Sequence, residues 1–374
     1  MSNLRTPSAL QTGLAVWAWI QGVSMVCTTN LVVARAVLCA SSDKGEFIEE
    51  YIATPAWSPV LSIESTGGAT WAELRANFAL VHAHLPPTLL LSEEIRAQVA
   101  AWCKQTDTSI VDANVIATLV LRAMVMWLFD VCVSDAEERM IVHATWEWRR
   151  EIAMKGPMRR ELKEAVVAWM VNLLRESKLF AHLPFLNQRS VQDPLVFSVF
   201  LQPFILSPMI NVGDVAVAWY NNAKIPPNEA SLRKCIASSH PFPIIERWVE
   251  RDILDPADSS RVLVPARTQV FIPLDEMGTL ASAGAAASWM PFGVGARGCA
   301  GQDIALKLML ALFTSLNESG RAIVPAKNHR YSGRNNDNSP FSVWVFLYQL
   351  WVFIAVCWRM LLKRLRRIVY KKAP

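Results

Sequence analysis

Residues 291–312 read PFGVGARGCAGQDIALKLMLAL, and this stretch is the most informative part of the sequence about the fold. Its glycines, at positions 293, 295, 298 and 301, allow tight backbone turns and close approach to a flat partner. Cys299 comes just before a helix that we expect to begin near Gly301 or Gln302, and the free amides of a helix N-terminus stabilise a thiolate. Arg297 adds a positive charge two residues earlier. The stretch therefore predicts a loop that presents one thiolate, against the simpler interpretation of Cys299 as a small buried apolar residue.

The same glycines also match the dinucleotide-binding pattern GxGxxG. Gly293, Gly295 and Gly298 have the required spacing, and Glu318 lies 20 residues after the last of them. That fingerprint has to follow a β-strand inside a βαβ unit. The preceding residues, ASAGAAASWM, lack β-branched alternation, and the motif comes late in the chain. We therefore disfavour a dinucleotide site.

The ten residues from Phe292 to Gly301 resemble, at each defined position, the haem-binding signature of the cytochrome P-450 family. The resemblance implies a haem-thiolate fold that is mainly α with a small β portion, here in a shortened form. It also implies haem as the cofactor, with Cys299 as the axial thiolate ligand of the iron. Arg297 would then contact a haem propionate, and Phe292 would pack beside the sulfur.

Two further segments resemble the parts of this family that hold the haem propionates. Trp71 and Arg75, in the sequence WAELR, resemble the WxxxR of the family's C helix. The same spacing recurs at 146–150, but the first copy precedes the apolar segment 112–130, as the family order requires. Arg247 would be a further propionate ligand, since SSHPFPIIERWVERDI resembles the segment that leads from the K helix into the sheet. The simpler interpretations are an ordinary helix start and a surface arginine.

Other family landmarks depart from the pattern. Glu229 and Arg233 resemble the K-helix ExxR pair, but they are four residues apart instead of three. In the oxygen-activating helix Asp214 stands at the place of the catalytic acid, whereas Val215 occupies the position expected for threonine. Pro203 and Pro208 argue against a long straight helix leading into this region. The resemblance covers about residues 65–320.

Hydrophobic periodicity predicts that the middle of the chain is mostly helical. Residues 159–178 carry one apolar stripe, 112–130 form an apolar helix with Asp112 as its N-cap, and Ser92 opens a shorter helix through Cys103. Predicted strands are few and late, at Arg261–Val264, Thr268–Pro273 and Arg321–Val324. The sequence therefore favours a mainly α architecture.

Composition and charge narrow the classes of function. The chain has 374 residues, 52% of them hydrophobic and 18% charged, which excludes a disordered protein. Seven basic residues within 359–374 account for its net charge of +5, because the rest of the chain has 30 basic and 32 acidic residues. A nucleic-acid partner is therefore not expected. Seven scattered cysteines without a CxxC pair disfavour a disulfide scaffold or a zinc ribbon.

Both ends of the chain are apolar enough to suggest membrane-associated helices. Residues 341–358 contain no charge, and three tryptophans and a basic flank add interfacial character. At the other end no charge occurs between Thr6 and Ala34, although polar residues interrupt the run. We expect an N-terminal membrane segment in 1–40, the haem-thiolate domain in 41–338, and a C-terminal apolar helix with a basic tail in 339–374. A signal peptide at the start and a buried core helix at the end are the alternatives.

Three functions follow from these observations. The first is a haem-thiolate monooxygenase that oxidises an apolar small molecule in secondary metabolism, with a reductase as redox partner. The second is a haem-thiolate isomerase, dehydratase or peroxygenase, which needs no threonine in a proton relay. The third is a membrane-bound, non-catalytic remnant that holds no haem. For an active member, the resemblance implies a location at the endoplasmic reticulum membrane.

Overall fold

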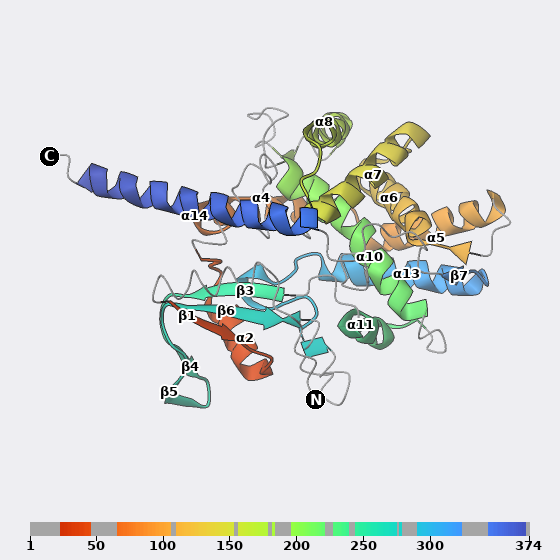
Figure 1. Cartoon of the computed structure of the whole chain (residues 1–374). Helices are drawn as coiled ribbons and strands as arrows, with labels where there is room; N and C mark the ends of the chain where they lie inside the picture. Colours follow the sequence, from red (N-terminus) through yellow and green to blue (C-terminus); the bar gives the residue numbers. More distant parts are fainter. Residues whose placement is uncertain are drawn as a thin grey trace.

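In a computed structural model the chain folds into a large helical part and a smaller part built around a β-sheet (Figure 1). The structure describes residues 23–45, 66–105, 110–152, 156–178, 182–183, 196–220, 227–238, 244–274, 277–278, 290–323 and 343–371. This architecture confirms the prediction of a mainly α fold with a small β portion.

The helical part is held together by four helices that pack on one another. They are α5 (Thr88–Gln105), α6 (Ala113–Phe129), α10 (Ser207–Tyr220) and α13 (Gln302–Glu318). The predicted cap of α6 is confirmed, because the Asp112 side chain accepts hydrogen bonds from the Asn114 and Val115 amides. α6 is buried along most of its length, as its all-round apolar sequence requires. Helix α5 begins at Thr88, so Ser92 lies inside the helix and does not open it.

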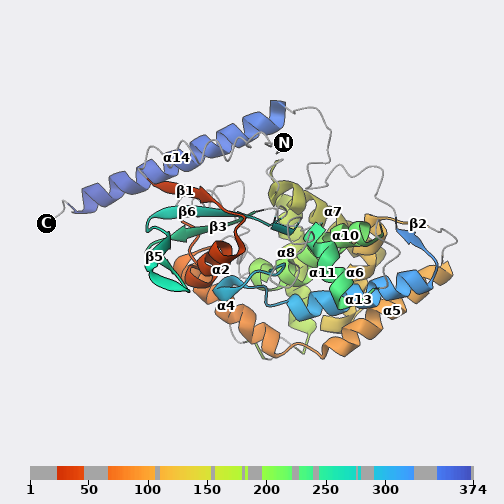
Figure 2. The ribbon, with the colours of Figure 1, turned by 90° about the horizontal axis from the view of Figure 1, so that it is seen from below.

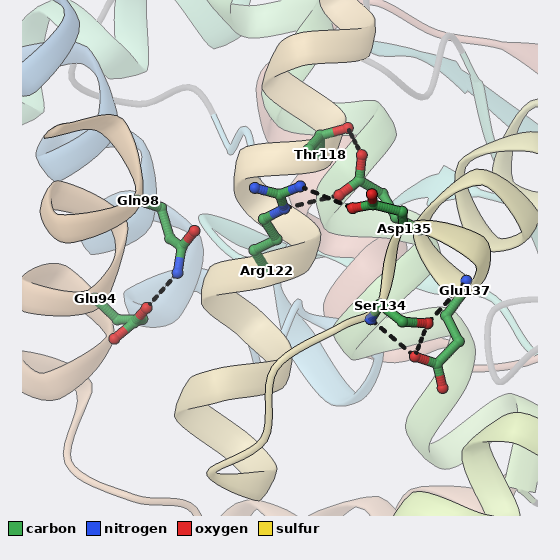
Figure 3. A network of polar contacts seen from close by, with 8 residues as sticks. Glu94, Gln98, Thr118, Arg122, Ser134, Asp135 and Glu137 are labelled. Carbon is green, nitrogen blue, oxygen red and sulfur yellow. Dashed lines mark hydrogen bonds and ion pairs between the residues drawn. The ribbon is translucent and has the colours of Figure 1, made fainter. Parts of the chain in front are cut away.

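Helices α7 (Asp135–Ile152) and α8 (Arg160–Glu176) cover this core, the second close to its predicted bounds. A polar network ties α7 to α6 (Figure 3). Arg122 donates to Glu138 at 2.7 Å, and Thr118 donates to the same carboxylate at 3.2 Å. Ser134 and Glu137 form a capping box at the start of α7, with the serine hydroxyl 2.6 Å from the carboxylate.

The chain stays helical through both prolines that were expected to prevent a long helix. Residues Phe197–Leu206 form a π-helix (η3) that contains Pro203, and α10 follows at Ser207 without a break. The Ser207 amide donates to the Gln202 carbonyl, five residues earlier. Because a π turn is wider than an α turn, it accommodates the missing N–H and the ring of proline. The prolines therefore do not interrupt the helical chain, although the part that contains Pro203 is a π-helix and not a regular α-helix.

The sheet part contains the strand order β1–β6–β3. β6 (Thr268–Pro273) pairs in parallel with β1 (Ser24–Cys27) and antiparallel with β3 (Ile244–Val249). A hairpin of β4 (Ile253–Asp255) and β5 (Asp258–Val264) and a short pair of β2 (Ile110–Val111) and β7 (Ala322–Ile323) complete the strands of the described residues. The three predicted strands are confirmed within a few residues.

The two ends of the described chain behave differently. β1 and α2 (Leu31–Ala40) fall within the range 1–40, yet β1 joins the sheet and α2 buries Ala34, Val37 and Leu38. The folded body thus includes residues 24–40, and any membrane segment would have to precede them, outside the described part. At the other end α14 (Val343–Lys371) runs along the side of the molecule where β1 lies (Figures 1 and 2).

Candidate active site

The loop around Cys299 is shaped by glycines and ends at the start of α13. A short 3₁₀ turn, η6 (Gly295–Arg297), precedes Cys299, and Gly301 is the N-cap of α13. The Cys299 amide donates to the Phe292 carbonyl at 2.8 Å, which closes the loop. Gly295 has a φ of +73°, and a Cβ there would lie 2.2 Å from the Leu38 carbonyl oxygen of α2. Only glycine therefore allows α2 to support the loop.

The Cys299 side chain is exposed at the end of this loop. It lies beside Gly301, where an added Cβ would come within 3.9 Å of the sulfur. Phe292 is partly buried and packs against the hydrophobic core. The loop thus presents the thiol at a helix N-terminus, as its sequence predicts.

Trp71 and Arg75 lie at the same loop, on helix α4 (Gly68–Ala83). The Arg297 guanidinium stacks over the Trp71 ring, with 4.6 Å between its Cζ atom and the ring centroid. Arg75 Nη2 donates to the Gly298 carbonyl at 3.0 Å. Helix α4 and the loop, which are far apart in the sequence, therefore bring two guanidinium groups and an indole together at residues 297 and 298, just before Cys299.

Arg297 is buried and holds the loop against two other segments. Its side chain donates to the carbonyl oxygens of Ser42 and Thr66. Sequence patterns cannot reveal these partners, because any residue type supplies a backbone carbonyl. Arg297 thus has a structural role in addition to the charge that it contributes.

Arg247 lies on β3, in register with Val270 of β6, and is buried. Its Nη1 donates to the Glu246 carbonyl at 2.8 Å. The backbone amide of the neighbouring Trp248 donates to the Asp43 carbonyl at 2.8 Å. Asp43 follows Ser42, whose carbonyl accepts a hydrogen bond from Arg297. β3 and the Cys299 loop therefore share one support, although a role for Arg247 at the site stays a prediction.

Asp214 lies on α10 and is engaged by a neighbouring helix. Arg149 of α7 donates to its carboxylate, with 2.6 Å between Nη2 and Oδ2, and the Arg149 side chain is buried. Val215, the next residue, is buried in the core. Residues 146–150, the second WxxxR, have structural partners: Trp146 donates to Asn114 and Arg150 to the Pro157 carbonyl. The Arg149–Asp214 pair is a contact across 65 residues that the sequence reasoning missed.

Glu229 and Arg233 do form an ion pair on α11 (Glu229–Ser238), at 2.8 Å. Both side chains are exposed, with 63% of the Glu229 side chain and 37% of the Arg233 side chain accessible to solvent. The family pattern implies a buried pair behind the haem. The pair in this chain is a surface contact between residues one helical turn apart.

The residues at the loop fit a haem by the chemistry of their donors. A haem needs one axial ligand from this side and cations for two propionate carboxylates. Cys299 offers the thiolate, Arg75 and Arg297 offer guanidinium groups, and Trp71 offers an indole N–H. The described residues contain no cluster of three His, Cys, Asp or Glu side chains that could hold a bare metal ion.

Solved structures identify the fold as that of the cytochromes P-450. CYP175A1 from Thermus thermophilus is 17% identical with a TM-score of 0.58, over 82% of this chain and 87% of that one. A 6-coordinated cytochrome P-450 from the same species is 17% identical at TM-score 0.57, over 81% and 89% of the two chains. A zebra fish cytochrome P-450, in a structure with progesterone, is 14% identical at TM-score 0.57, over 78% and 85%. No protein-family model and no curated protein sequence matches the chain. The chain therefore has a shortened cytochrome P-450 fold, and such a fold suits haem-thiolate oxygenase chemistry in general.

Proposed function

We propose that this protein is a haem-thiolate monooxygenase that oxidises an apolar small molecule, with Cys299 as the axial ligand of the iron. The observation that carries the proposal is the assembly of Trp71, Arg75 and Arg297 around the Cys299 loop. These residues come from two elements that lie more than 200 positions apart in the sequence. Their convergence gives the short motifs a spatial context that sequence spacing cannot provide.

Each residue at the loop has a task in this proposal. The haem supplies the activation of dioxygen when it is bound. Cys299 provides the thiolate, and the N-terminus of α13 stabilises its negative charge. Arg75 and Arg297 bind the propionates, with the Trp71 N–H and Arg247 as further donors, because a guanidinium forms strong charge-assisted hydrogen bonds with a carboxylate. Phe292 packs beside the sulfur.

Asp214 is the proposed proton carrier on the oxygen side of the haem. Because Arg149 holds its carboxylate, Asp214 has to leave this ion pair before it can move a proton. Val215 has no hydroxyl that could pass the proton on. These two observations favour the second candidate, an isomerase, dehydratase or peroxygenase, more than they favour a relay-dependent monooxygenase.

The remaining parts of the proposal concern partners and location. We propose a reductase as the electron source, an apolar substrate from secondary metabolism, and attachment to the endoplasmic reticulum membrane. Val343–Lys363, within α14, is long and apolar enough to span a bilayer, which supports membrane attachment. No nucleic acid is expected as a partner.

The test is a carbon monoxide spectrum of the reduced, full-length protein, recorded beside Cys299→Ser. A strongly red-shifted Soret band that disappears in the variant would support thiolate ligation. Cys132→Ser is the matched control, since Cys132 is also exposed but lies after α6, and it should keep the band. A protein that binds no haem would overturn the proposal and favour the non-catalytic remnant.

Electron supply separates the two enzymatic candidates. With a reductase and NADPH, Asp214→Asn should slow dioxygen consumption about tenfold or more, since general acid–base catalysis contributes at least that much. Haem content should stay unchanged. If wild type turns over with peroxide alone and Asp214→Asn does not affect it, the peroxygenase candidate is the correct one.

A further inference from the structure

Helix α14 exposes a continuous apolar face. Its exposed large hydrophobic side chains recur every three or four residues, which places them on one side of the helix. They include Leu347, Leu350, Trp351, Ile354, Trp358, Leu361 and Leu365. The face thus passes through the uncharged segment and continues into the basic one, over about 27 Å of helix. An apolar surface of this extent marks a contact with another partner.

The opposite side of α14 is buried against other parts of the chain and is called the docked side below. Val352, Val356 and Met360 repeat every four residues, and their exposed fractions are 0%, 0% and 5%. Near the start of the helix, burial and the charge of the Glu151 carboxylate raise the pKa of Tyr348 to about 12. In both views the helix runs along the side of the β1–β6–β3 sheet (Figures 1 and 2).

A comparison with the other apolar helical segment shows why α14 needs an explanation. Phe197–Ala216 also passes the length and hydropathy test for a span, but it is 72% buried inside the fold. Val343–Lys363 is more apolar, with a mean hydropathy of 1.8, and only 17% buried. The first segment is a core helix. The second is covered on one stripe only.

This arrangement does not suit a helix that crosses a bilayer. The docked side chains extend over residues 352–360, about 12 Å of helix, so the folded body would have to enter the hydrocarbon with them. The basic residues give a second reason, since charged side chains are costly inside the hydrocarbon. Arg359 and Lys363 lie one turn apart on the docked side, where the helix leaves the uncharged segment, and five more basic residues follow up to position 372.

We propose that α14 lies in the plane of a membrane surface, with its apolar face in an anionic bilayer and its docked stripe on the folded body. The basic residues that follow Lys363 then meet anionic headgroups, and the apolar face is buried among the outer parts of the acyl chains. Tryptophans at 344, 351 and 358 are suited to this interfacial depth. The body and the basic tail stay on the same side of the membrane, whereas a single span would separate them.

The first test is co-flotation of the full-length protein with vesicles of neutral phosphatidylcholine, with or without 30% phosphatidylserine. Binding should be stronger with the anionic lipid and should weaken as salt screens the headgroups. The double variant Trp351→Glu, Trp358→Glu should bind about tenfold more weakly or worse. The matched control is Leu89→Glu, Leu90→Glu, which changes two exposed leucines on α5 and should bind like wild type. Equal binding of both double variants would overturn the proposal, and so would an apolar face covered by a second copy, seen as a dimer that the α14 variant abolishes.

The second test distinguishes an in-plane helix from a spanning one. A fluorescent amino acid is placed singly at positions 347, 354, 361 and 365, and its quenching is measured with lipids brominated at different depths. An in-plane helix gives the same shallow depth at all four positions. A depth that changes steadily along the helix would show that α14 spans the bilayer and would overturn the proposal. Circular dichroism of each variant checks that it is folded.

Discussion

Two groups of charged side chains in this molecule form different kinds of contact. At the Cys299 loop, Arg75 and Arg297 donate to backbone carbonyl oxygens, and Arg297 also stacks on the Trp71 ring. On α7, Arg149 and Glu151 are joined to groups of opposite charge, Asp214 at 2.6 Å and Lys163 at 2.6 Å. The arginines of the loop therefore join the loop to the backbone of other segments, whereas the α7 pairs join helices through their side chains.

The largest effect is expected from Arg297→Ala. The substitution removes two charge-assisted hydrogen bonds and leaves the Ser42 and Thr66 carbonyls without this donor, which should cost about 4 kcal/mol of unfolding free energy. Haem content after purification should fall about tenfold or more. Urea unfolding and the haem-to-protein absorbance ratio measure the two effects. Full haem retention in a destabilised variant would show that Arg297 supports only the loop.

The second prediction concerns pH. Burial raises the pKa of Glu151 to about 7, even though Lys163 opposes the shift. Between pH 4.5 and 7 the folded state therefore binds more protons than the unfolded state, so the contribution of Glu151 to stability is present at low pH and is lost as pH rises. The loss should reach about 3 kcal/mol across this window. Denaturant unfolding at pH 5 and 7 measures it.

Glu151→Gln is the control for the pH prediction. Glutamine does not titrate, so the difference in unfolding free energy between pH 5 and 7 should be smaller in this variant than in wild type. An equal difference in the two proteins would assign the pH dependence to other groups and would show Glu151 to be ionised throughout the window.

Lys163→Met tests the buried Lys163–Glu151 pair by removing its cation. Removing one member of a buried ion pair commonly costs about 3–5 kcal/mol. Here we expect about 2 kcal/mol at pH 7 and less at pH 5, because Glu151 can take up a proton when its cation is gone. Haem content should not change. If haem were lost without any loss of stability, the α7 pairs would not be purely structural.

The smallest effect is expected from Glu229→Gln. An exposed ion pair one turn apart on a helix contributes about 0.3–0.5 kcal/mol, and salt reduces that further. Haem binding should be unaffected. A loss of several kcal/mol or of haem, measured as for Arg297→Ala, would mean that Glu229 and Arg233 do act as the buried pair of the family pattern.

Sequence reasoning worked best where the signal is local. The cap at Asp112, the apolar stripe of 159–178 and the glycine loop before α13 each depend on neighbours within a few residues. It did not foresee the π-helix at Pro203, because the argument against a long straight helix considers only α turns and the chain adopts a π turn instead. It placed Ser92 at a helix start because serine is a common N-cap. A serine inside a helix can instead donate to the carbonyl four residues earlier, as Ser92 does to Thr88.

The candidate site was predictable in part. Ten residues of local pattern were enough to select Cys299, Arg297 and Phe292, because glycine conformation and helix-terminus chemistry are written into neighbouring residues. The choice of Trp71 over Trp146 required an argument about chain order, and the structure places the first at the loop and the second against Asn114. The pairing of Asp214 with Arg149 has no sequence signal, since charged residues occur on every exposed helix.

The spacing of residues along the chain was enough to predict the helices at 112–130 and 159–178, the late strands, the thiolate loop and the apolar segment at 341–358. Packing in three dimensions decided that Phe197–Ala216 is a core helix and that α14 keeps an open face. It also decided that Trp71 and Arg75 meet Arg297, whereas Asp214 is held by Arg149. The physical reason is that burial and ion pairing depend on which surfaces meet in three dimensions, and residues far apart in the sequence supply those surfaces.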